Sequence, residues 1–159
     1  MTLTDLVTFR PTPPTLATEP DHVGIAGLPL NLVAAAPPQT LHGELFDHDV
    51  SVRFTPHHFT WTYGDGTTST TTTPGRSWTQ RGDAQFTPTP TSHVYAERGT
   101  YTAAVTVSYS PVVTFDTGQT QAVAGYVTST SAEQSLRILE ARTALVAYTC
   151  TEDPTGPGC

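Results

Sequence analysis

Carboxylate side chains stand at two places in the sequence where they could support chemistry. Asp65 lies between two glycines in the segment 64–66, and Glu44, Asp47 and Asp49 lie close together. A carboxylate can act as a general acid or base, and clustered carboxylates supply the oxygen ligands that Ca²⁺ prefers. Two glycines also allow a tight turn in which the Asp65 carboxylate accepts backbone N–H groups, and Asp47 with Asp49 is typical of a polar hairpin turn. We therefore expect turn roles at both places.

The adjacent histidines His57 and His58 resemble a pair of metal ligands. Neighbouring residues of a strand point to opposite faces, however, so we expect one of these histidines on the surface and the other in the interior. No serine lies in a G-x-S-x-G elbow, and the sequence contains no glycine-rich phosphate loop. The sequence thus predicts no catalytic residues, no metal and no cofactor.

The two cysteines, Cys150 and Cys159, flank a segment rich in proline and glycine at residues 153–158. Turn residues of this kind let the chain fold back on itself, and no histidine lies near enough in the sequence to complete a metal site. We expect a disulfide that closes residues 150–159 into a C-terminal tail, formed in an oxidising compartment.

Composition excludes several classes of function. The net charge is −7 and the seven basic residues are scattered arginines, so nucleic acid and anionic lipid would repel the chain. The longest apolar run, Leu28–Ala36, is too short to span a membrane. About a fifth of the residues are threonine, which suits half-exposed sheets and exported proteins of high-GC bacteria. This composition and the expected disulfide indicate an extracellular or cell-surface protein. Because residues 1–5 do not resemble a signal peptide, we expect that the signal has been removed.

The elements that would position these residues are predicted to be short strands. Residues 1–22 contain several prolines and are expected to form an extended arm or linker. Residues 67–92 are expected to form a long loop with one short strand near Ser77–Gln80, and Ala132–Leu139 suits a helix as well as a strand. Hairpin turns are expected at residues 47–49 and 116–118. The expected strands are Leu28–Ala34, Leu41–Phe46, Val50–Phe54, His58–Tyr63, Tyr101–Tyr109, Val112–Phe115, Gln121–Val127, Ser135–Leu139 and Thr143–Tyr148.

Three motifs, taken in order, resemble the signature of the polycystic-kidney-disease (PKD) domain family. They are an aromatic–x–aromatic–Gly-Asp-Gly turn at residues 61–66, a His–x–Tyr at 93–95 and a Gly–x–Tyr at 99–101, and the match covers about residues 27–109. The resemblance implies an all-β, immunoglobulin-like antiparallel sandwich over residues 23–149, with an inserted hairpin near residues 112–127 and the long loop. It implies structural roles for the motif residues, which are Trp61, Tyr63, Gly64, Asp65, Gly66, His93, Tyr95, Gly99 and Tyr101.

In this interpretation Trp61 lies between the two sheets, Tyr95 ties a loop to the sheet, and His93 contacts the glycine turn. The family resemblance further implies a non-catalytic structural, adhesion or protein-interaction module of the bacterial cell surface. A partner, protein or glycan, is expected to contact Arg76, Trp78 or Arg81 in the long loop, because arginine and aromatic side chains are common interface anchors. The alternative is a carbohydrate-binding module in which exposed rings such as Trp78 or Tyr126 stack on sugars.

Overall fold

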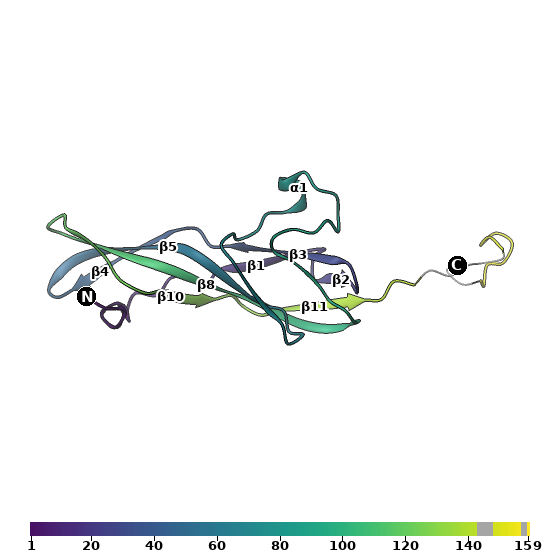
Figure 1. Cartoon of the computed structure of the whole chain (residues 1–159), viewed down its shortest axis with the longest axis horizontal. Coiled ribbons are helices and arrows are strands. Elements are labelled where there is room, and N and C mark those ends of the chain that lie inside the picture. Colours follow the sequence, from purple (N-terminus) through teal and green to yellow (C-terminus); the bar gives the residue numbers. More distant parts are fainter. Residues whose placement is uncertain (143–147, 157–158) are drawn as a thin grey trace.

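The computed structural model describes residues 1–142, 148–156 and 159, and it is an all-β protein with two sheets packed as a sandwich (Figure 1). The smaller sheet has the order β1 (Thr15–Glu19), β3 (Pro29–Ala35), β7 (Ser92–Val94). The larger sheet follows the path β2 (Val23–Ile25), β11 (Gln134–Leu139), β8 (Gly99–Phe115), β5 (His48–Thr62), β4 (Gln39–Leu45). Beside this path, β6 (Thr68–Thr71) pairs with β5, while β9 (Thr120–Ala122) and β10 (Val127–Thr130) pair with β8. The helical elements are a 3-10 turn, η1 (Leu3–Leu6), and a single α-helical turn, α1 (Trp78–Arg81).

Two long antiparallel strands, β5 and β8, form the centre of the larger sheet and run side by side along the long axis in Figure 1. The expected strands Val50–Phe54 and, except for Tyr63, His58–Tyr63 are both parts of β5, and Tyr101–Tyr109 and Val112–Phe115 are both parts of β8. A β-bulge between Pro56 and His58 lets β5 continue through the proline, because a bulge relieves the ladder of one backbone donor. Two continuous strands, of which β5 is bulged, therefore replace the breaks that the sequence indicated.

One hydrophobic core lies between the sheets and centres on Trp61, which is 0% exposed as expected. Its indole N–H donates to Thr71 Oγ1 at 2.9 Å, so the buried ring leaves no polar group unpaired. The alternating residues of Tyr101–Tyr109 lie beside it in the same sheet, and Leu16, Leu30 and Leu32 of the smaller sheet supply the facing surface. The largest side chains that are almost wholly buried are Trp61, Tyr95, Tyr109, Phe54, Leu6, Leu30, Leu32, Leu136, Val52, Val105, Val107 and Val113.

The first 22 residues belong to the sandwich, so the prediction of an extended arm is wrong for this segment. Strand β1 pairs with β3 from Thr15↔Ala35 to Glu19↔Asn31, and Leu6, Phe9 and Leu16 are buried in the core. The aromatic ring of Phe9 lies over Gly43, where a Cβ atom would come within 2.8 Å of the ring. The strand could not be recognised from the sequence, because the prolines between these apolar residues interrupt the alternation that identifies a strand.

The segment 67–92 is also more ordered than a loop. It contains β6 and the helical turn α1, which replaces the short strand expected near Ser77–Gln80. The Ser77 hydroxyl accepts the Gln80 N–H at the start of α1, and Gly82 ends the turn at φ 72°. Trp78 is only 6% exposed, and its indole N–H donates to Thr87 O at 2.9 Å. The tryptophan anchors this segment instead of extending from it.

Other boundaries agree with the sequence. The turn at residues 116–118 joins β8 to β9 as expected. The turn between β4 and β5 is made by Phe46 and Asp47, both at positive φ, one residue earlier than the expected turn at 47–49, and His48 and Asp49 belong to β5. Residues Gln134–Leu139 form strand β11, so the strand interpretation of this segment is confirmed over the helix. Most of the expected strand Thr143–Tyr148 lies outside the described residues. Among the described residues, no helix has the length and apolar character needed to cross a membrane.

Candidate functional site

The Gly64–Gly66 turn is held by its own carboxylate. Asp65 Oδ1 accepts the backbone N–H of Thr67 at 3.0 Å and the Thr67 hydroxyl at 2.6 Å. Gly64 has φ 82°, and a Cβ atom there would lie 2.4 Å from Thr102 O, so glycine is required by both conformation and space. Asp65 therefore has the turn role expected of it.

The imidazole of His93, on β7 of the smaller sheet, closes the turn. Its Nε2 lies 2.7 Å from Asp65 Oδ2, which confirms the predicted contact, and its ring stacks on Tyr63 with 3.7 Å between ring centroids. The Tyr95 hydroxyl donates to Tyr63 O at 2.8 Å, and the Tyr101 hydroxyl donates to Glu97 O at 2.9 Å. These contacts join the end of β5 to β7 and to the start of β8.

Electrostatics at the turn favour an ionised Asp65. Burial by itself would raise its pKa, but hydrogen bonds from Thr67 and His93 outweigh burial and hold the pKa of Asp65 below its ordinary value. Burial also raises the pKa values of Tyr63 and Tyr95, so both phenols stay neutral. A carboxylate engaged by several donors beside neutral phenols is suited to holding a turn, and it offers no free base for catalysis.

The loop residues predicted to bind a partner divide into two kinds. Arg76 and Arg81 are exposed, and Arg81 Nε pairs with Asp83 Oδ2 at 2.8 Å. Trp78 is buried, so the expectation that its ring is available to stack on a sugar or anchor a partner is wrong. Tyr126, the other ring named for sugar stacking, is 42% exposed.

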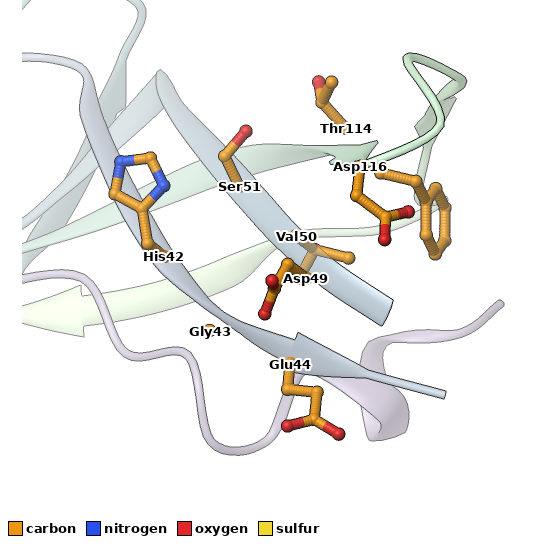
Figure 2. Close-up of a pocket in the computed structure, with 9 residues that line it drawn as sticks. His42, Gly43, Glu44, Asp49, Val50, Ser51, Thr114 and Asp116 are labelled. Carbon is orange, nitrogen blue, oxygen red and sulfur yellow. The ribbon is translucent and has the colours of Figure 1, made fainter. Parts of the chain in front are cut away.

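An open cleft lies where β4, the start of β5 and the end of β8 meet (Figure 2). Register places His42 opposite Ser51 and Ser51 opposite Thr114, while Glu44 faces Asp49. The remaining polar groups of the cleft come from the turn that follows β8. There, His48 Nδ1 lies 3.1 Å from Asp116 Oδ1, within hydrogen-bond distance.

The cleft contains acidic groups, but they do not form a cation site. The side chains of Glu44, Asp49 and Asp116 are exposed and spread along the strand ends in Figure 2, without converging on one point. In the part of the chain that the structure describes, no three histidine, cysteine, aspartate or glutamate side chains are placed to hold a metal ion. No hydrogen bond joins His42 to Ser51 within the described residues.

A cluster that sequence reasoning missed lies at the bulge of β5. Because one extra residue is inserted there, the alternation that should separate His57 from His58 fails, and their Nδ1 atoms lie 3.3 Å apart. The ring centroid of Tyr126 lies 5.0 Å from that of His57 and 4.9 Å from that of His58. The expectation of one surface and one interior histidine is thus wrong: His57 is exposed and His58 half-buried, in one group. Pro56 could have indicated the bulge, because a proline inside a sheet is usually found at an edge or a bulge.

The C-terminal tail has the expected disulfide, which joins Cys150 to Cys159 with 5.4 Å between their Cα atoms. Side-chain oxygens of Glu152 and Asp153 accept hydrogen bonds from Thr149 and Thr155 within the same short segment. Both are exposed local contacts that shape the tail.

Comparison with known proteins gives no further assignment of the site: no protein-family model matches the chain, and no curated protein matches it.

Proposed function

We propose that this chain is a non-catalytic, extracellular structural or protein-interaction module with a PKD-like, immunoglobulin-type sandwich, and that it binds its partner through the outer face of the larger sheet. The observation that carries the proposal is the chemistry of that face. It is polar and largely uncharged, and threonine hydroxyls stand in line across four strands.

The threonine row runs from β6 to β10. Thr60 is the register partner of both Thr70 and Thr106, and Thr106 is the partner of Thr130. Hydroxyl oxygens in the row lie 3.5 Å apart between Thr60 and Thr70 and 2.8 Å apart between Thr106 and Thr130. Their strand neighbours Phe59, Trp61, Val105 and Val107 are buried, so the row faces away from the core.

A hydroxyl row of this kind suits recognition more than catalysis. Threonine hydroxyls both donate and accept hydrogen bonds, and the β-branched side chain loses little freedom when it is held in a strand. Such a face can bind a polar, uncharged surface with a small entropic cost. The long paired strands also give the module the extended, rigid body that a structural element of a cell surface needs.

Two further observations support the extracellular setting and the PKD-like type. A disulfide is typical of chains that fold in an oxidising compartment. The residues of the PKD-like signature contact one another in space, through the Asp65–His93 pair and the Tyr95–Tyr63 hydrogen bond. The carbohydrate-binding alternative is weaker, because Trp78 is buried and Tyr126 packs against two imidazoles.

The proposal is tested by changing the face without changing the core. Immobilised chain is incubated with a cell-surface extract of the producing organism, and a glycan array is run in parallel. The double variant Thr106→Arg, Thr130→Arg should lose the captured protein, whereas Thr79→Arg, on exposed α1, should retain it. Equal capture by both variants would contradict the proposed face, and saturable binding to a glycan would favour the alternative function.

A further inference from the structure

We propose that His57 and His58 form a two-imidazole binding site for a divalent transition-metal ion, with Zn²⁺ as the ion that its geometry fits. Nothing in the proposed function requires this site. The inference begins from the β-bulge, which turns two adjacent histidines to the same side of the sheet. In a regular strand the two rings would be separated by the sheet itself.

The distance between the two rings fits tetrahedral coordination. Nδ1 of His57 and Nδ1 of His58 are 3.3 Å apart. If both nitrogens bind the same Zn²⁺ ion at the usual distance of about 2.05 Å, a separation of 3.3 Å corresponds to an N–Zn–N angle of about 107°, close to the tetrahedral angle. The separation of the two nitrogen atoms therefore needs little change for both to bind one ion.

The surroundings of the pair favour an ion that accepts nitrogen ligands. Imidazole suits Zn²⁺, Cu²⁺ and Ni²⁺, whereas Mg²⁺ and Ca²⁺ prefer oxygen. The ring of Tyr126 packs against both imidazoles and restricts their rotation, so part of the entropy cost of ordering two ligands is already met. The net charge of −7 also favours the approach of a cation.

Without an ion, the same two nitrogen atoms can form a hydrogen bond. One Nδ1–H can donate to the other Nδ1, with the two rings in different neutral tautomers. Binding an ion requires a lone pair on both Nδ1 atoms, so the shared proton moves to the Nε2 atom of its own ring. The rings stay neutral and the step releases no proton overall. No described side chain completes a set of three histidine, cysteine or carboxylate ligands, so the other coordination positions are taken by water.

The experiment is a titration of the intact chain with ZnCl₂, followed by ¹H–¹⁵N NMR of the imidazole rings and by isothermal calorimetry. We expect saturable binding of one ion per chain, with ¹⁵N shifts that mark Nδ1 coordination in His57 and His58. Either His57→Gln or His58→Gln should weaken Zn²⁺ binding at least about tenfold, because the second imidazole then no longer acts intramolecularly. The matched control His42→Gln removes an exposed, single imidazole from β4 and should leave the binding isotherm unchanged.

Titration with MgCl₂ in place of ZnCl₂ should give no imidazole shifts. A thermal melt of each variant shows whether the fold is intact, and the ring shifts of the unaltered chain provide a readout that needs no variant. Zn²⁺ binding that persists in the double variant His57→Gln, His58→Gln, or ring shifts confined to other histidines, would overturn the site.

Discussion

Asn31, the only asparagine in the chain, shows how one polar side chain can organise the fold. It is fully buried, and its Nδ2 donates to Glu19 Oε2 at 2.7 Å and to Arg76 O at 2.9 Å. Its Oδ1 accepts the Thr89 hydroxyl at 2.7 Å. Because these partners come from β1 and from both ends of the segment 76–89, Asn31 joins the smaller sheet to the segment that carries α1.

We expect Asn31→Ala to lower the free energy of unfolding by about 2–4 kcal/mol, because buried partners of the amide, including the Glu19 carboxylate, would lose hydrogen bonds. The change in exposed Thr79, Thr79→Ala, is the control and should stay within about 0.5 kcal/mol. Urea unfolding followed by tryptophan fluorescence measures both. Equal stability of the two variants would show that the amide network contributes nothing.

Asp65 makes the stability of the fold depend on pH in the acid range. Because its pKa is lowered in the folded chain, Asp65 contributes stability above the pKa of the unfolded chain, about 3.9, and that contribution is lost as the pH falls through the lower folded value. The melting temperature of the unaltered chain should therefore exceed that of Asp65→Asn at neutral pH, and the difference should shrink below about pH 4. Melts across the acid range test this, with exposed Asp47→Asn as the control. A difference that stays constant as the pH falls would be the contrary result.

At the scale of elements, the N-terminal segment is a structural part of the sandwich. Leu6 and Phe9 are buried, while Val7 between them is 60% exposed. Phe9 fills the space left over Gly43 on β4, the last strand on the path of the larger sheet, and so packs on the face of that sheet.

The change Phe9→Ala should cost about 3–5 kcal/mol of stability, the range for deleting a large core side chain. Val7→Ala, two residues earlier and exposed, should cost well under about 1 kcal/mol. Chemical denaturation of both variants checks the contrast. If Phe9→Ala were as stable as Val7→Ala, the segment would be the extended arm that its prolines suggested.

The sequence predicts those elements whose side chains alternate without interruption. The alternation of Tyr101–Tyr109, the aromatic face of Phe59, Trp61 and Tyr63, and the Gly64–Gly66 turn each carry a local signal, and the structure contains them as expected. The buried roles of Phe9, Asn31 and Trp78 could not be predicted, because they depend on partners far away in the sequence. Likewise the pairing of His57 with His58 follows from a bulge whose only local signal is the preceding proline.

At the scale of the whole molecule, the outer face of the larger sheet and the core beneath it have opposite chemistry. The core side of β5 and β8 is aromatic and aliphatic, whereas the outer side carries the row formed by Thr60, Thr70, Thr106 and Thr130. The cleft between β4, the start of β5 and the end of β8 lies near the ends of the long strands, and so does the Gly64–Gly66 turn. Neither interrupts this row. We propose that this row contacts the partner.

Threonine-methyl NMR tests that claim most directly. The chain is labelled with ¹³C at its threonine methyl groups and titrated with the surface protein that it captures. Our account predicts that the signals of Thr60, Thr70, Thr106 and Thr130 shift or broaden, while those of Thr79 on α1 and Thr155 in the C-terminal tail stay unchanged. Partner binding that leaves the four signals of the row unchanged and shifts those of Thr79 or Thr155 would contradict it.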